Sequence, residues 1–111
     1  MIATNTIELG TLIHGTLRNE DLLTTFAAEL RRLQHGNESP LLTEAVKAMN
    51  RGYIVGFDWA EENENIPMSE IVNDLMDALN EYAPDGYYFG AIEGDGSDFG
   101  FWQDEIMGMF P

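Results

Sequence analysis

Hydrophobic and polar positions in the first third of the chain predict one strand and one helix. From Ile7 to Ile13 the two kinds of residue alternate, which is the period of a half-buried strand. Apolar residues three and four positions apart then predict a helix that Asn19 caps and Gly36 ends. Acidic residues fall in its first turn and arginines in its last turn, where the helix dipole favours them.

The middle of the chain begins with a second predicted helix. Ser39 is its expected N-cap, Pro40 its first residue and Gly52 lies beyond its end. The segment Tyr53–Trp59 is rich in β-branched and aromatic residues and precedes the polar residues 61–65. It therefore predicts a strand that leads into an exposed loop. Continuation of the second helix is the alternative for this segment.

The last third predicts a third helix followed by a hairpin. Apolar positions indicate a helix from about Ser69 to about Tyr82, and Pro84 and Gly86 follow as terminating residues. Aromatic runs within residues 87–102 predict the two strands of the hairpin. The expected fold class is α+β, with about three helices packed on a small antiparallel sheet and a C-terminal β-hairpin. We expect a single acidic domain over residues 1–111.

The predicted hairpin turns at Asp95-Gly96, a dipeptide typical of two-residue loops. In that register Phe101 faces Gly90 and covers the space that glycine leaves. The same register places Glu93 opposite Asp98, and like charges directly opposed are unfavourable. We therefore expect a group outside the hairpin to neutralise these acids.

Composition suits one folded core, with 44% hydrophobic residues in 111. The chain has no cysteine, which excludes disulfides and thiolate metal sites. It also has no apolar run of the roughly 20 residues that span a bilayer and no secretory leader pattern, so we expect a cytoplasmic protein that does not bind membranes.

The negative charge is concentrated in the second half of the chain. Residues 1–51 contain all five basic residues and six acids, whereas residues 52–111 contain fourteen acids and no Lys or Arg. Such a field repels nucleic acid and attracts basic protein surfaces. Four acids on the third predicted helix are spaced 4, 3 and 4 residues apart, which places them on one face. A solvated face that serves solubility is the alternative.

Catalytic and metal-binding patterns are weak by comparison. Oxygen ligands crowd the turn from Glu93 to Asp98, but their spacing is not that of an EF-hand, and turn formation explains them. His14 and His35 are the only imidazoles, and we interpret both as loop or helix-end residues. We therefore expect no enzymatic activity, no metal ion and no cofactor.

The aromatic residues of the hairpin alternate between the two faces of their strands, so core packing cannot take all of them. Some are expected to form a contact surface. The apolar residues Ile106, Met107, Met109 and Phe110 predict either a cover for the open face of the sheet or a homodimer contact.

Two segments resemble a group of small acidic proteins encoded in bacterial, phage and plasmid genomes. These segments are GTLRNEDLLTTF at residues 15–26 and LMDALNEYAPDGYYFGAIEGDGSDFGFW at residues 75–102. The resemblance implies a setting in mobile elements, where acidic proteins block CRISPR effectors or restriction enzymes by occupying their nucleic-acid channels. It implies no role for any individual residue.

Charge and resemblance together predict a non-enzymatic inhibitor that binds the basic nucleic-acid-binding surface of a host defence complex in the bacterial cytoplasm. The protein itself is not expected to bind nucleic acid. The alternative is a protein-interaction or regulatory module that uses the aromatic hairpin without nucleic-acid mimicry. The residues expected to contact the partner are acids of the second half and two hairpin aromatics: Glu61, Glu62, Glu64, Glu70, Asp74, Asp77, Glu81, Glu93, Asp95, Asp98, Tyr88 and Trp102.

Overall fold

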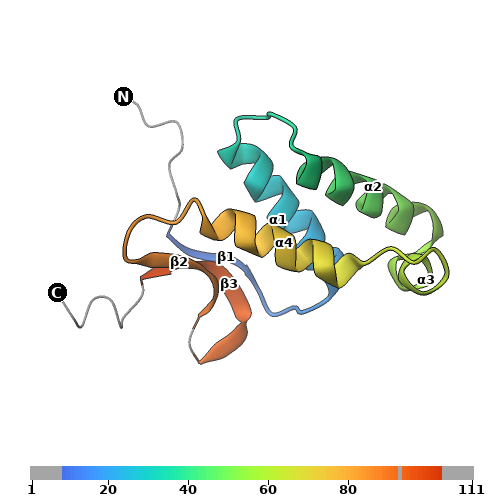
Figure 1. Ribbon diagram of the computed structural model, residues 1–111. Helices are drawn as coiled ribbons and strands as arrows, with labels where there is room; N and C mark the ends of the chain where they lie inside the picture. The colour runs from blue at the N-terminus through green and yellow to red at the C-terminus, as the bar shows by residue number, and fades with distance from the viewer. Residues whose placement is uncertain (1–8, 93, 104–111) are drawn as a thin grey trace.

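The computed structural model describes residues 9–92 and 94–103 and has the α+β fold expected from the sequence (Figure 1). A three-stranded antiparallel sheet in the order β1-β3-β2 carries helices on one face. The elements are β1 (Gly10–His14), α1 (Asn19–Leu33), α2 (Pro40–Val55), α3 (Phe57–Asn63), α4 (Met68–Asn80), β2 (Tyr87–Ile92) and β3 (Asp95–Gln103). Helices α1 and α4 contact the sheet, and α2 packs on the side of α1 that faces away from it.

The core lies between α1, α4 and the sheet. Phe26 of α1 meets the rings of Phe89 and Phe99 edge-on, with centroids 5.2 and 5.4 Å apart. Phe89 in turn contacts Phe101 across the hairpin, and all four rings are buried. Three of the six hairpin aromatic residues, Phe89, Phe99 and Phe101, are therefore core residues, which agrees with the expectation that the core does not take all six.

The ends of α1 differ slightly from the prediction. Asn19 is the first helical residue and Arg18 occupies the capping position without a side-chain hydrogen bond, so the predicted cap is wrong by one residue. At the other end, His35 and Gly36 both have positive φ, at 58° and 79°. The Gly36 N–H donates to the carbonyl of Arg31, which confirms the predicted stop.

The predicted strand at Tyr53–Trp59 is wrong. Helix α2 continues to Val55, which confirms the alternative, and a fourth helix, α3, begins at Phe57. Gly52 lies inside α2 because the ring of Phe57 packs on it; a Cβ there would lie 2.5 Å from that ring. The helix break falls instead at Gly56, which has a φ of 96°.

The hairpin forms in a register one residue away from the prediction. Phe89 pairs with Phe101 and Gly90 with Gly100, and Ile92 pairs with Asp95 after a register shift between Ala91 and Ile92. The predicted register would put Phe89 and Phe101 on opposite faces of the sheet. The observed one places both on the core face, and burial of the two rings favours it.

The remaining predicted elements need smaller changes. The strand expected from Ile7 appears as β1 from Gly10; Leu9 is exposed, and Ile7 lies outside the described residues. The helix predicted over residues 69–82 is confirmed as α4. Among the helices of the described chain, none is long and apolar enough to cross a membrane.

Candidate partner-binding surface

Four exposed carboxylates follow the outer side of α4. Glu70, Asp74 and Asp77 lie opposite the buried residues Ile71, Val72, Leu75 and Leu79, and Glu81 continues the row at the helix end. We call these four residues the α4 stripe. Within residues 9–92 and 94–103, no ion pair involves any of the four. The predicted single face is confirmed, and its charge is left uncompensated by neighbouring cations.

Three acids of the first half, by contrast, are paired with nearby arginines. Arg31 contacts Glu38 at 2.8 Å, and Arg18 contacts Glu20 beside it. Arg32 donates through Nε and a terminal nitrogen to Glu29, at 3.0 and 2.7 Å. Three arginines of the first half thus neutralise acids of the same half by direct contact, whereas the α4 stripe has no such partner in the described residues.

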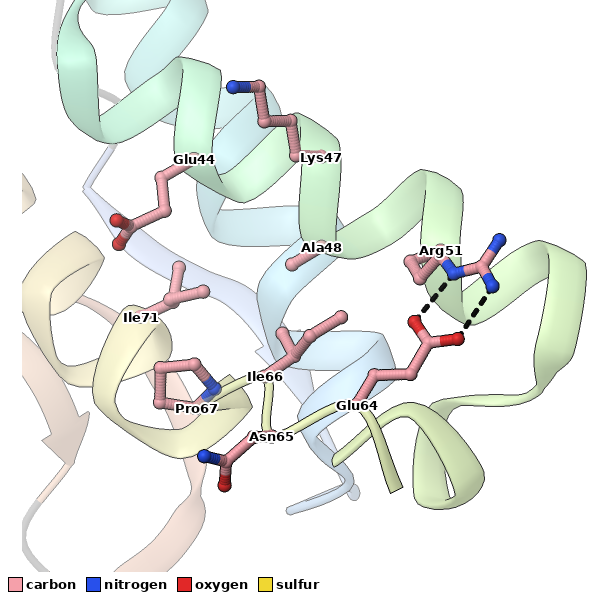
Figure 2. Close-up of a pocket in the computed structure, with 9 residues that line it drawn as sticks. All are labelled: Glu44, Lys47, Ala48, Arg51, Glu64, Asn65, Ile66, Pro67 and Ile71. Atoms are coloured by element: carbon pink, nitrogen blue, oxygen red, sulfur yellow. Dashed lines mark hydrogen bonds and ion pairs between the residues drawn. The ribbon is translucent and has the colours of Figure 1, made fainter. Parts of the chain in front are cut away.

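Glu64 departs from its predicted role because Arg51 neutralises it. The guanidinium of Arg51 donates to both carboxylate oxygens, at 2.5 and 2.6 Å. These bonds lower the pKa of Glu64 and raise the pKa of Arg51. Figure 2 shows the pair at one end of a cavity of about 440 Å³ that Lys47 and Ile66 also line. Glu64 is therefore an unsuitable contact for a basic partner.

The two other acids of the predicted loop lie in α3. Glu62 is exposed, while Glu61 is partly buried and lines a small cavity of about 210 Å³ together with Arg18, Glu20 and Asp58. Glu62 is the more accessible of the two to a protein partner.

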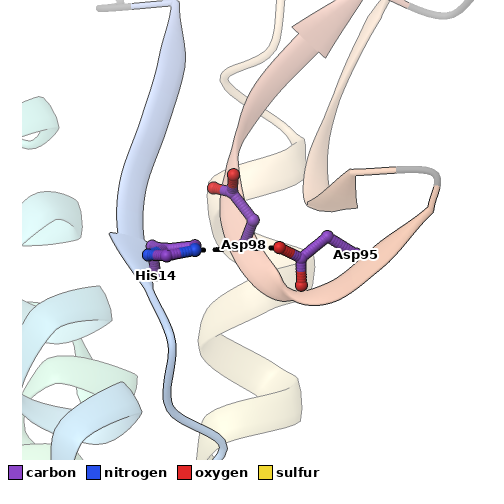
Figure 3. A group of neighbouring side chains, drawn as sticks. All are labelled: His14, Asp95 and Asp98. Atoms are coloured by element: carbon purple, nitrogen blue, oxygen red, sulfur yellow. Dashed lines mark ion pairs between the residues drawn. The ribbon is translucent and has the colours of Figure 1, made fainter.

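The hairpin acids lie on a different surface from the α4 stripe. Asp98 alternates with the buried Phe99 along β3, so it points to the sheet face away from the helices. Its Cα partner is His14 of β1, which also approaches Asp95, with 3.7 Å between Nε2 and Oδ2 (Figure 3). Glu93 lies outside the described residues. The register that would pair Glu93 with Asp98 does not form, because Ile92 of β2 pairs with Asp95.

Asp95 is held by the residue two positions later. The Ser97 backbone N–H and hydroxyl both donate to Asp95 Oδ1, at 3.0 and 2.9 Å, and these bonds lower the pKa of Asp95. These local hydrogen bonds are of the kind expected for Asp near a turn. The predicted two-residue loop at Asp95-Gly96 is wrong, however, because both residues belong to β3.

The hairpin aromatics proposed as contacts use their polar atoms internally. Trp102 Nε1 donates to the carbonyl of Gly90 at 2.9 Å, and the Tyr88 hydroxyl donates to that of Ala91 at 3.1 Å. Both side chains are half-buried. Hydrogen bonds within the hairpin therefore orient the side chains of Trp102 and Tyr88. Because both are half-buried, only part of each ring is accessible to a partner.

A more exposed apolar group lies at the junction of α2 and α3. Tyr53, Ile54 and Trp59 have exposed fractions of 66%, 71% and 51%. Sequence reasoning missed this group because it assigned the segment to a strand. The signal that could have found it is a row of small residues at helical spacing, Ala45, Ala48 and Gly52, which are buried. This spacing predicts that α2 continues past Gly52, with Tyr53 and Ile54 on its outer side.

Comparison with protein-family models, curated proteins and solved structures finds no match. The resemblance to mobile-element proteins therefore stays a prediction, as does the homodimer contact, whose residues 106–110 lie outside the described chain. His35 is exposed in the turn after α1, as expected for a helix-end residue. The same expectation is wrong for His14, which is the last residue of β1.

Proposed function

We propose that the protein is a non-enzymatic inhibitor that binds the basic nucleic-acid-binding surface of a defence complex, such as a CRISPR effector or a restriction enzyme, in the bacterial cytoplasm. The observation that carries this proposal is the α4 stripe. Its four carboxylates are exposed and unpaired within the described chain, while the four arginines of the first half each pair with an acid elsewhere.

The spacing of charges along the stripe can be compared with that of phosphates along DNA. From Glu70 to Glu81 the stripe covers twelve residues and spans about 16 Å at the rise of an α-helix, which gives a charge roughly every 5.5 Å. One DNA strand carries a phosphate about every 3.4 Å, so the stripe alone is sparser than DNA. Glu62 of the preceding helix adds to the exposed charge of the second half. We assign the contact to these five residues: Glu62, Glu70, Asp74, Asp77 and Glu81.

The test is competition with DNA on purified defence complexes. Labelled duplex DNA is bound to a panel of CRISPR effector and restriction complexes, and its displacement by the protein is measured as salt rises. We expect displacement at low salt that weakens steeply as ionic strength increases. The double variant Asp74→Asn/Asp77→Asn should displace DNA at least about tenfold less effectively, because it removes the centre of the stripe.

A matched control separates the stripe from the net charge. Glu44→Lys changes the net charge by the same two units as the double variant but alters an exposed residue of α2. It should displace DNA nearly as well as the wild type. Equal loss in both variants, or no displacement from any complex, would contradict the proposal.

The second candidate function is a protein-interaction module without nucleic-acid mimicry, and the exposed junction of α2 and α3 favours it. Apolar side chains this exposed are typical of contact surfaces. In that case the protein should bind a partner complex without displacing DNA, and binding is measured directly by calorimetry. Trp59→Ala should abolish this binding, whereas Asp74→Asn/Asp77→Asn should leave it intact. Trp102→Ala tests the hairpin in the same way.

A further inference from the structure

Three potential metal ligands from distant parts of the chain meet at one edge of the sheet. His14 ends β1, Asp95 begins β3, and Asp98 lies directly opposite His14 (Figure 3). One ligand atom from each of the three residues lies within 4.8 Å of the others. The group consists of one imidazole and two carboxylates. The antiparallel pairing of β1 with β3 brings these side chains together.

One carboxylate oxygen of Asp98 lacks a hydrogen-bond partner among the described residues, which points to a cation beside it. Its Oδ1 atom is buried, yet it accepts no hydrogen bond in the part of the chain that the structure describes. A carboxylate oxygen removed from water without a partner is costly, and such atoms are rare in folded proteins. A positive ion beside Asp98 would supply the missing partner.

The neighbouring acid is already oriented for coordination. Ser97 donates two hydrogen bonds to Asp95 Oδ1, which leaves Oδ2 directed at His14. Hydrogen bonds of this kind to one atom of a ligand commonly fix the direction of the other in metal sites.

We propose that His14, Asp95 and Asp98 bind a divalent transition-metal ion of the zinc type, with one position left for water or a fourth ligand. The ligand set decides the class of ion. Calcium takes six to eight oxygen ligands, whereas imidazole nitrogen with carboxylate oxygen suits zinc and its neighbours. The ion joins the end of β1 to the hairpin, so its binding stabilises the sheet. This site is separate from the α4 stripe and does not depend on the proposed inhibitor function.

The distances allow the site to close. Zinc bonds of about 2.0–2.2 Å in tetrahedral geometry place ligand atoms about 3.3–3.6 Å apart. The most distant pair of ligand atoms, within 4.8 Å of each other, must therefore approach by roughly 1.2–1.5 Å. The side chains of His14 and Asp95 are 63% and 45% exposed, so small rotations of both can provide this movement.

A simpler account is an ion pair between protonated His14 and Asp95. That pair needs neither Asp98 nor a metal, and it leaves Asp98 Oδ1 without a partner. The two accounts differ in the role of Asp98. Asp98→Asn preserves the ion pair but removes a metal ligand.

The test is titration of the full chain, freed of metal, with Zn²⁺ by calorimetry, together with thermal unfolding with and without the ion. We expect one Zn²⁺ per chain and a higher Tm, since binding to the folded state alone stabilises it. His14→Ala and Asp98→Asn should each weaken binding at least about tenfold and abolish the Tm shift. Co²⁺ in place of Zn²⁺ should give the visible absorption of a tetrahedral site.

Controls distinguish this site from loose binding to an acidic protein. His35→Ala removes the other imidazole, and Asp74→Asn/Asp77→Asn weakens the α4 stripe; both should bind Zn²⁺ as the wild type does. Ca²⁺ at the same concentration should produce no comparable Tm shift. The proposal fails if Zn²⁺ does not bind at about 100 µM, or if Ca²⁺ and the His14→Ala variant give the same shift as wild-type protein with Zn²⁺.

Discussion

Gly90 and Gly100 face each other in the hairpin, but only one of them lacks room for a side chain. A Cβ on Gly100 would lie 2.0 Å from the carbonyl oxygen of Gly10 in β1, which is a backbone atom held by the sheet. A Cβ on Gly90 would lie 3.6 Å from the ring of Tyr88, an ordinary contact. Gly100 therefore permits the close approach of β1 to the central strand.

We predict that Gly100→Ala lowers the free energy of unfolding by about 3 kcal/mol, because β1 must shift to accept the methyl group. Gly90→Ala should leave stability unchanged or raise it by a few tenths of a kcal/mol, since it reduces the freedom of the unfolded chain. Urea unfolding followed by circular dichroism measures both. Equal effects of the two substitutions would show that β1 does not approach β3 as described.

At the scale of the elements, the sequence predicts where helices occur better than it predicts where they begin and end. Helix α4 is predicted closely, since its apolar residues recur over thirteen positions. The junction of α2 and α3 is not, because Gly52 resembles a terminator and only the packing of Phe57 on it shows why the helix continues. The hairpin register is set by a similar cause. The dipeptide Asp95-Gly96 favours a turn locally, but burial of Phe89 beside Phe101 outweighs it.

Helix α2 offers a test of capping, because its N-cap is predicted and observed at the same residue. The Ser39 hydroxyl accepts a hydrogen bond from the Leu42 N–H at 3.3 Å. Ser39→Ala should therefore lower the free energy of unfolding by about 1 kcal/mol. Asn19→Ala is the matched control, since Asn19 is a helical residue that caps nothing, and it should change stability little. Similar losses for the two variants would contradict the observed helix starts. Urea unfolding measures both.

For the molecule as a whole, the sequence predicts the charge asymmetry but not which acids are free. The α4 stripe is local, so helical spacing alone places its members together. The Arg51–Glu64 pair joins residues 13 positions apart, and His14 meets the hairpin acids from more than 80 positions away. Only the packing of α2 beside α3 and of β1 beside β3 creates these contacts. Long-range pairing thus removes Glu64 from the acidic surface and gives Asp95 and Asp98 a separate role.

The α4 stripe should also reduce the stability of the fold. Like charges three and four residues apart repel one another along a helix, and Asp77 and Glu81 lie near the C-terminal end of α4, where the dipole disfavours acids. Asp74→Asn/Asp77→Asn removes three such neighbouring pairs. We predict that it raises the free energy of unfolding by about 1 kcal/mol at low salt. At about 1 M NaCl, where the Debye length is about 3 Å, the gain should disappear.

The Glu44→Lys variant distinguishes local repulsion within the stripe from the general effect of net charge on stability. It changes the net charge equally, yet it removes no acid pair and places two lysines three residues apart, because Lys47 follows. Urea unfolding at low and high salt should show a stability gain only for the stripe variant; an equal gain in both would assign the repulsion to the whole molecule. The DNA-displacement assay distinguishes a functional stripe from one that serves only solubility. If the same substitutions that stabilise the fold also abolish displacement, the stripe is maintained at a cost to stability because a basic partner requires it. A stripe that serves only solubility would give the stability gain with displacement unchanged.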